Sequence, residues 1–187
     1  SGANTLAKLA KGSDDEVLTL ASGVPSWAAS GGAGKLGQVI SVTQTATASS
    51  TASAWADITG MTATITPSAT DSKILWHYSI WGGSQTQYGH IQIVYGDASA
   101  LTTQAIGDAA GSRTRVTTGA FYEGAADAAI HMSMQGLDSP ATTSATTYKL
   151  QWFVSSGTLY LNRRTTDTDN ATFDRGISTI TLMEVLA

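Results

Sequence analysis

The apolar residues of this chain recur at every second position in short runs, and no stretch shows a convincing 3.6-residue period of a helix. The clearest run, 73–81, places four large side chains on one face: Ile74, Trp76, Tyr78 and Ile80. Such runs, separated by turn residues at roughly 8–12-residue spacing, are typical of a sandwich of short strands. The sequence therefore predicts an all-β fold.

We expect about ten strands, a number typical of an antiparallel jelly-roll sandwich. Their expected ranges are 39–47, 61–66, 73–81, 88–95, 100–106, 115–122, 128–134, 147–154, 158–162 and 176–185. The runs 147–154 and 158–162 flank Ser155-Ser156-Gly157 and are predicted to pair as a hairpin. If successive strands alternate in direction, the first and last are antiparallel and can pair.

The N-terminal residues 1–37 differ from the rest of the chain. Their few large apolar residues are too few for a core, and Trp27 is the one large apolar anchor. A stretch dominated by Gly, Ala and Ser follows from Ala28 to Gly37, with no side chains able to hold a fold. We therefore expect a short stalk remnant and linker over residues 1–37 and a head domain over residues 38–187.

Alternating strand directions also sort the turns between the two ends of the head. Turns 67–72, 96–99, 123–127 and 155–157 are expected at the stalk end, and loops 48–60, 82–87, 107–114, 135–145 and 163–175 at the distal end. All five arginines lie in or beside the distal loops: Arg113, Arg115, Arg163, Arg164 and Arg175. Because loops on a rigid scaffold carry function, the distal end is the predicted functional end.

Composition excludes several classes of function. Charged residues are 13% of the chain, about half the usual share, and the net charge is −4 without a basic block. Nucleic acid is therefore not an expected partner. The absence of cysteine excludes a thiolate nucleophile and Cys-ligated metal. No apolar run approaches the roughly 20 residues of a membrane-spanning helix, so we expect no membrane insertion and no cofactor.

Two motifs with a chemical precedent lack the context that their chemistry needs. Gly32-Ala33-Gly34-Lys35-Leu36-Gly37 matches G-x-G-x-x-G, but a linker precedes it and a strand follows, where a dinucleotide site needs a strand and then a helix. His77, His90 and His131 lie on separate expected strands without metal or catalytic spacing. We predict no catalytic residue. A pair of carboxylates acting on a glycoside stays open, because the sequence does not give their separation.

The acidic stretch Asp167-Thr168-Asp169-Asn170 offers oxygen ligands to a hard cation, but the Gly and Glu of an EF-hand loop are missing. We favour the alternative, in which acids and arginines form a network that orders the distal loops or bridges subunits. The residues assigned to this network are Asp108, Arg113, Arg163, Arg164, Asp167, Asp169, Asp174 and Arg175. No metal site is predicted.

Aromatic and amide side chains surround the Gly-rich turn 82–87. Aromatic rings stack on the apolar faces of sugars, and amides both donate and accept hydrogen bonds, so this combination favours glycan binding. The candidate receptor-binding residues are Trp81, Gln85, Gln87, Tyr88 and His90. The alternative is that Trp81 ends a core strand and Tyr88 packs on it.

The last expected strand carries apolar residues on both faces. One face has Ile177, Met183 and Val185, and the other has Ile180, Leu182 and Leu186. An exterior strand of a monomeric sandwich should have one wet face. The pattern favours contact with another subunit, and the alternative is a strand buried on both sides within one subunit.

Several segments resemble phage fibre proteins, especially those of marine and cyanobacterial phages. The stretch from Gly12 to Leu20, continued by Gly23-Val24-Pro25-Ser26-Trp27, resembles a stalk motif that precedes a C-terminal head. Gly107 to Arg113, Asp138 to Ser144 and Ile177 to Val185 resemble recurrent segments of such heads. The resemblance implies a homotrimer of jelly rolls of the tumour-necrosis-factor type on a three-fold stalk.

By this resemblance the chain is a virion fibre head, external on the virion and assembled in the host cytoplasm. Its implied partners are copies of itself, upstream fibre or virion proteins through the N-terminal stalk, and a surface glycan or outer-membrane protein of the host. One alternative is a purely structural fibre or capsid appendage. The alternative from another class is a depolymerase acting on surface polysaccharide.

Overall fold

The computed structural model describes residues 8–14, 16–29, 36–84, 89–98, 100–103, 105–119 and 127–186. The regular secondary structure of these residues consists of β-strands alone, which confirms the all-β prediction. None of them belongs to a helix long and apolar enough to cross a membrane. The chain divides into two compact units, Ser1–Ala33 and Gly34–Ala187. The boundary predicted from the sequence is at residue 37.

The first unit contains one β-hairpin. β1 (Glu16–Ala21) pairs antiparallel with β2 (Val24–Ala29). Ser22 and Gly23 both have positive φ (52° and 82°), as in the two-residue turns that match the twist of paired strands. Three large apolar side chains of the hairpin are mostly exposed: Leu18 (57%), Leu20 (74%) and Val24 (64%).

The second unit, the head, is a sandwich of two antiparallel sheets. Its strands are β3 (Leu36–Gln44), β4 (Ala48–Ser50), β5 (Ala56–Ile65), β6 (Lys73–Ser84), β7 (Gly89–Asp97), β8 (Ala100–Thr102), β9 (Thr118–Gly119), β10 (Ile130–Asp138), β11 (Thr146–Val154), β12 (Leu159–Leu161) and β13 (Ser178–Val185). In one sheet β3, β13, β6 and β10 are successive neighbours, and β12 and β4 extend it. The other sheet has the order β5–β11–β7–β8, with β9 also paired to β7. We call them the β6 sheet and the β11 sheet. Their strand orders are those of a jelly roll, which confirms the predicted fold class.

Alternation along each strand builds the core between the two sheets. On β6, Ile74, Trp76, Tyr78 and Ile80 face inward and are at most 3% exposed. Tyr148 and Leu150 of β11 face them from the other sheet and are fully buried. The face assignment made from the sequence for 73–81 is therefore confirmed.

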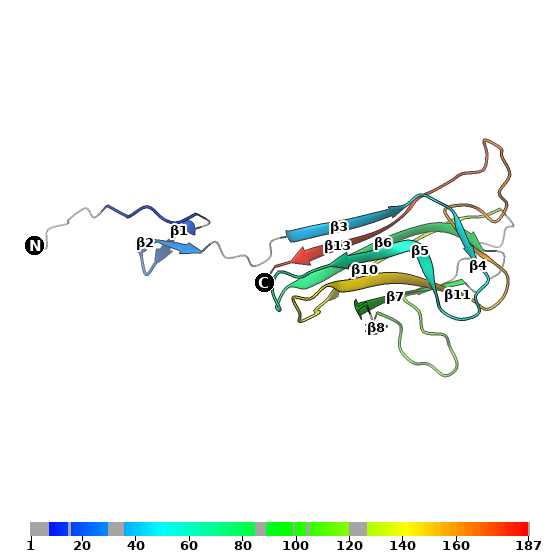
Figure 1. Cartoon of the computed structure of the whole chain (residues 1–187), viewed down its shortest axis with the longest axis horizontal. Coiled ribbons are helices and arrows are strands. Elements are labelled where there is room, and N and C mark those ends of the chain that lie inside the picture. Colours follow the sequence, from blue (N-terminus) through cyan, green and yellow to red (C-terminus); the bar gives the residue numbers. More distant parts are fainter. Residues whose placement is uncertain are drawn as a thin grey trace, which may run out of the picture. The chain divides into compact units, whose positions relative to one another are not determined.

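The two ends of the sandwich differ in what they hold. Leu36 at the start of β3 lies opposite Val185 at the end of β13, so the first and last strands of the head pair as expected. We call this the entry end. At the far end, β6 finishes at Ser84 and β7 begins at Gly89. The loop 163–175 projects at the far end (Figure 1).

Strict alternation of strand direction fails, and this corrects the predicted positions of the 135–145 and 155–157 turns and of Asp127, the described residue of the 123–127 turn, which lies at the far end. β8 and β9 both run antiparallel to β7, so β10 starts at the far end, with Ile130 opposite Gly82. As a result the 135–145 turn lies at the entry end and not at the distal end. The 155–157 turn lies at the far end of the head and not at the entry end, because β11 ends opposite Gly89.

The predicted hairpin of 147–154 and 158–162 is also wrong. β11 pairs with β5 and β7, whereas β12 pairs with β6 and β4 in the other sheet. The 155–157 turn therefore carries the chain across the sandwich. β12 continues the position of β13 along one edge of β6, opposite Gly82–Ser84, where β13 covers Lys73–Ser79.

A buried asparagine holds the gap between β12 and β13. Asn162 is fully buried with φ of 58°. Its Nδ2 donates to the carbonyl oxygens of Gln44 (2.7 Å) and Ala46 (2.9 Å), between β3 and β4, and its Oδ1 accepts from the Ser178 hydroxyl (2.7 Å). Its backbone N–H donates to the Trp81 carbonyl oxygen (2.8 Å). One side chain thus supplies hydrogen bonds to backbone carbonyls where the sheet is interrupted, between β3 and β4 and between β12 and β13.

We expect Asn162→Ala to lower the free energy of unfolding by about 3 kcal/mol, because it removes the hydrogen bonds to the carbonyls of Gln44 and Ala46 and to the buried hydroxyl of Ser178. Asn162→Asp should be at least as harmful, since a carboxylate cannot donate to the two carbonyls. Thermal unfolding measures the effect, with the exposed Asn170→Ala as control. A melting temperature within about 2 °C of the wild type would contradict the role, because a loss of this size shifts melting by several degrees.

A buried carboxylate closes the entry end. Glu184 on β13 is 2% exposed, and its Oε1 accepts from the backbone N–H and the hydroxyl of Ser68 (2.6 Å each). Its Oε2 accepts from Gln38 Nε2 of β3 (3.2 Å). Burial raises the pKa of Glu184, but the hydrogen bonds from Ser68 and Gln38 outweigh it and lower the pKa to about 2.

Because the folded-state pKa of Glu184 lies below the ordinary value of 4.5, its stabilising contribution is full above pH 4.5 and is lost as pH falls toward 2. Glu184→Gln should therefore be less stable than the wild type at pH 7, by about 1–3 kcal/mol, and the difference should narrow below pH 4.5. Urea unfolding at several pH values measures this. Asp71→Asn, an exposed change in the neighbouring turn, is the control, and a difference independent of pH would contradict the assignment.

Candidate functional site

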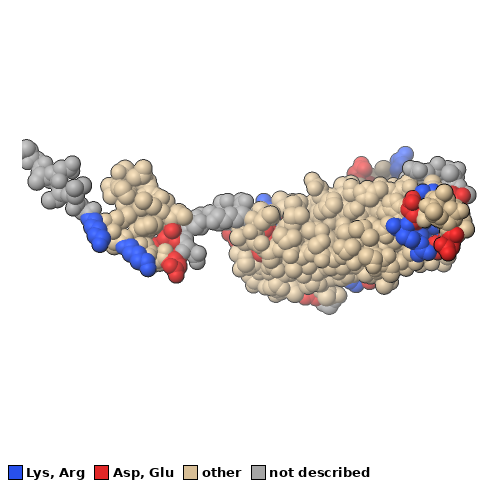
Figure 2. Space-filling model, turned by 90° about the horizontal axis from the view of Figure 1, so that it is seen from above, with Lys and Arg blue, Asp and Glu red and all other residues tan. Residues whose placement is uncertain are grey.

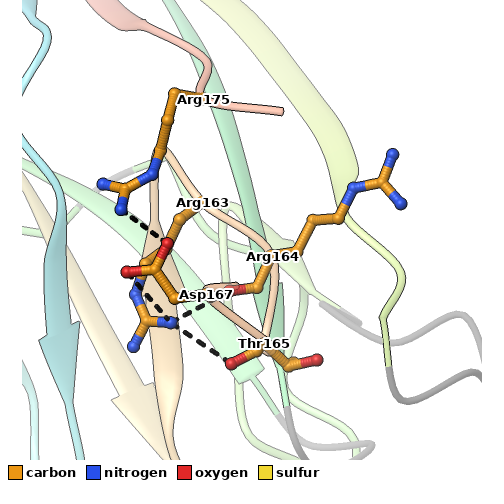
Figure 3. A network of polar contacts seen from close by, with 5 residues as sticks. All are labelled: Arg163, Arg164, Thr165, Asp167 and Arg175. Atoms are coloured by element: carbon orange, nitrogen blue, oxygen red, sulfur yellow. Dashed lines mark hydrogen bonds and ion pairs between the residues drawn. The ribbon is translucent and has the colours of Figure 1, made fainter. Parts of the chain in front are cut away.

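The loop 163–175 at the far end contains a network of ion pairs (Figure 3). Arg175 Nη2 contacts Asp167 Oδ1 at 2.5 Å, and Arg163 Nη1 lies 4.0 Å from Asp167 Oδ2. An isolated bridge between Arg163 and Arg175 pairs the two ends of the loop. The carboxylate of Asp167 therefore joins the ascending and descending sides of the loop.

Arg163 anchors this network to the sandwich. Its guanidinium carbon lies 3.8 Å from the centre of the Tyr160 ring, which belongs to β12 and is 8% exposed. Its Nη1 also donates to the carbonyl oxygens of Arg164 (3.3 Å) and Thr165 (3.2 Å). A cation over an aromatic face is stabilised by the ring quadrupole, so Arg163 fixes the base of the loop.

Arg164 connects the loop to the segment before β10. Its Nη2 contacts Asp174 Oδ2 at 2.7 Å, and its Nη1 donates to the Asp127 carbonyl oxygen (3.4 Å). Its guanidinium also lies over the Phe173 ring at 5.8 Å. Two segments that are far apart in the sequence are thus held together at the far end.

The loop holds a hollow of about 220 Å³ that contains three acids, Asp167, Asp169 and Asp174. Two of them are engaged by Arg175 and Arg164. Within the described residues, no group of three or more His, Asp or Glu side chains is arranged to hold a metal ion. Figure 2 shows that the charged atoms of the head visible in that view gather mainly at one end. Because the loop has three arginines and three aspartates, its surface offers both hydrogen-bond donors and acceptors without net charge.

The candidate receptor-binding residues do not form one cluster. Trp81 is half-buried on the outward face of the β6 sheet, under Gly176, where an added Cβ would lie 2.6 Å from the indole. His90 lies on the outward face of the other sheet and stacks on Phe153, with centroids 5.3 Å apart. The two side chains point away from each other across the sandwich. Gln85, Gln87 and Tyr88 lie outside the described residues.

The environment of His90 is apolar. Burial lowers its pKa, and its Nδ1 is buried without a hydrogen-bond partner within the described residues. A neutral ring packed on Phe153 matches a structural side chain more closely than an exposed ligand contact.

Asp108 and Arg113 belong to a separate loop, 103–117, along the flank of the sandwich. Arg115 Nε donates to the Gly107 carbonyl oxygen (2.6 Å), and Arg113 contacts the Ala110 carbonyl. The base of this loop lies with Trp76 and Met134, near the middle of β6 and β10. The described residues show no ion pair between it and the loop 163–175, so Asp108 and Arg113 do not join the network of that loop.

The segment Asp138 to Ser144 lies at the entry end, where it lines a hollow of about 350 Å³ with Tyr95 and Asp97. Tyr148 donates a hydrogen bond from its hydroxyl to Asp138 Oδ2 (2.7 Å). The segment forms the turn between β10 and β11, and this hydrogen bond orders it. Its position, like that of the 103–117 loop, separates it from the loop 163–175.

Asn162, Tyr160 and Glu184 were missed by the sequence analysis. Asn162 directly precedes Arg163 and Arg164, and an Asn at the start of a long loop is a residue that tolerates positive φ. That was the available signal. Glu184 shares the strand face of Ile180 and Leu182, and this alternation was the available signal for its burial.

Neither a family model nor a curated protein matches the sequence. Solved structures of infectious bursal disease virus are similar to the chain: the Gx strain (TM-score 0.40, 14% identity), the Gt strain (0.41, 13%) and the VP2 subviral particle (0.37, 14%). The alignments cover 91% of this chain and 41–42% of those chains, less than half of their length. At TM-scores below 0.5 these similarities carry no functional argument, and the jelly-roll assignment depends on the strand order itself.

We expect Asp167→Asn to increase tryptic cleavage within 163–175 roughly two- to five-fold, the change that a loss of about 0.5–1 kcal/mol from an exposed ion pair produces. The arginines released from Asp167 are themselves the cleavage sites. Asp169→Asn is the matched control, because the described residues give Asp169 no ion pair. Cleavage of the wild type should be the same with and without EDTA. Protection that depends on added Ca²⁺ would contradict the arginine network.

Proposed function

We propose that the chain is part of a homotrimeric virion fibre, whose head attaches the particle to a receptor on the host surface. The observation that carries the proposal is the β1–β2 hairpin, which forms from the segment that resembles a fibre stalk motif and leaves its apolar residues exposed. A two-stranded hairpin is marginally stable by itself in water. Copies of the same hairpin around a three-fold axis would cover Leu18, Leu20 and Val24.

The far end of the head supports attachment. It presents the loop 163–175 on a rigid sandwich, and the loop is fixed at its base by Arg163 and Asn162. Its exposed surface combines Arg, Asp, Asn and Thr side chains, which match the donors and acceptors of carbohydrate hydroxyls. Several weak contacts on one fibre give useful avidity.

We propose that the head is a binding protein and not an enzyme. Two of the three acids of the far-end hollow, Asp167 and Asp174, bind arginines. Glycoside hydrolysis needs a pair of carboxyl groups free to act on the substrate, one of them to protonate the leaving group. Among the described acids of this hollow, the ion pairs leave only Asp169 without an arginine.

Light scattering of the purified chain should give three times the 19.3 kDa chain mass, because the exposed hairpin needs copies of itself to cover it. The purified chain should also compete with virions for adsorption to host cells. It should not degrade the polysaccharide capsule of the host. A trimer that does not compete would indicate a structural appendage. Clearing of capsule zones would indicate a depolymerase, and a monomer at micromolar concentration would contradict the fibre proposal.

A further inference from the structure

The outward face of the β6 sheet carries an apolar row that crosses four strands. In register, Val39 of β3 lies opposite Met183 of β13, Met183 lies opposite Leu75 of β6, and Leu75 lies opposite Leu137 of β10. Val39 is 52% exposed and Leu137 is 56% exposed. Leu36 and Val185 form part of the adjacent row. Large apolar side chains therefore extend from one edge of the sheet to the other.

The middle of this face has hydroxyls, an amide and an imidazole. The next two rows are Ser41–Thr181–His77–Gln135 and Thr43–Thr179–Ser79–Ser133. Among the outward side chains of these four strands, Lys73 is the only Lys, Arg, Asp or Glu. The hydroxyl groups both donate and accept hydrogen bonds.

The opposite outward face, on the β11 sheet, is of another kind. It carries a charged cluster, in which Lys149 Nζ and Gln151 Nε2 contact the Asp57 carboxylate at 2.9 and 2.8 Å, and hydrogen bonds from Gln151 and Lys149 lower the pKa of Asp57. On the β6 face the polar contacts are those of hydroxyls, Ser41 with Thr181 and Ser79 with His131. The exposed large apolar residues of the head are Leu36, Val39, Met134, Leu137 and Ile177. All of them lie on β3, on β10 or directly before β13, so the described residues give the β11 sheet none. Of the two outward faces, only that of the β6 sheet carries large apolar side chains whose exposure to water is unfavourable.

We propose that this face, built from Val39, Met183, Leu75 and Leu137 with the hydroxyl rows beside them, is the surface through which the heads of three copies of this chain associate. The inference deepens the proposed fibre function, because it names the contact that makes the head trimeric. A copy of the chain fits where a charged partner does not, since the face offers no countercharge except Lys73. Ser and Thr hydroxyls are complementary to themselves.

The row also fits a three-fold arrangement. Cyclic contacts between three copies join one side of a surface to the other side of the next copy. The two ends of the row are both apolar and more than half exposed, with Val39 on the β3 edge and Leu137 on the β10 edge. The proposed contact therefore brings Val39 of one copy near Leu137 of the next.

A charge at either end of the row tests the interface in the full chain. Leu137→Glu and Val39→Glu should each reduce the mass measured by light scattering from three chains toward one. Their exposed positions allow the head to keep its fold, which circular dichroism checks. Thr62→Glu, on an exposed outward position of the β11 sheet, is the matched control and should remain trimeric.

Disulfide trapping gives a second measurement, because the natural chain has no cysteine. Within one chain, positions 39 and 137 are three strand spacings apart, about 14 Å, which exceeds the roughly 4.4–6.8 Å that a disulfide bridges. The double variant Val39→Cys, Leu137→Cys should therefore give covalent dimers and trimers on oxidation. Thr62→Cys with Leu101→Cys, at the two edges of the β11 sheet, should give none.

The outcomes separate the two proposals. A wild-type trimer in which Leu137→Glu and Val39→Glu keep the full mass, and in which the 39/137 pair gives no covalent species, overturns this interface and leaves the fibre proposal standing. A wild-type monomer overturns both. If a glutamate variant fails to fold, the cysteine pair decides: covalent trimers support the interface, and their absence overturns it.

Discussion

The side chain of Asn162 makes the architecture of the head possible. Two strand positions of the β6 sheet are interrupted at the same level, one between β3 and β4 and the other between β12 and β13. An interruption inside a sheet leaves backbone carbonyls without a ladder partner, and burying them unpaired is costly. Asn162 satisfies the carbonyls of Gln44 and Ala46 and is itself held by Ser178. The loop 163–175 can therefore be inserted into the sheet while the sandwich stays closed and the base of the loop stays fixed.

This arrangement also explains which parts of the fold the sequence predicts. Alternation is a local property, so the strands and the inward face of β6 follow from spacing. The sheet that a strand joins is decided by contacts far away in the chain. The turn at Ser155-Ser156-Gly157 signals a reversal, but it cannot indicate that β11 and β12 lie in opposite sheets. β12 is too short to alternate and is buried at all three residues. The prediction that successive strands alternate in direction was wrong because β8 and β9 run in the same direction. As a result, β10 and β11 run opposite to their predicted directions.

The candidate site could likewise be predicted from the sequence only in part. Opposite charges within a short loop find each other without help from the fold, so the pairing of Arg163, Arg164 and Arg175 with Asp167 and Asp174 could be predicted from composition and proximity. Trp81 and His90 are close in sequence but belong to strands of different sheets. In a jelly roll, outward side chains on such consecutive strands point in opposite directions, which is why the structure does not bring these two together. Asp108 and Arg113 were grouped with the far-end loop only because strand parity placed them there.

The low charge content of the chain is explained by where its charged residues lie. Arginine and aspartate concentrate in the far-end loop, and Glu184 is buried at the entry end, while the outward face of the β6 sheet holds a single lysine. A soluble monomer needs a wet surface on every side, and the β11 sheet meets that need with its Asp57, Lys149 and Gln151 contacts. The β6 sheet instead exposes Val39 and Leu137. A head that packs sideways against copies of itself and presents one end to a receptor requires this division between uncharged flank and charged tip.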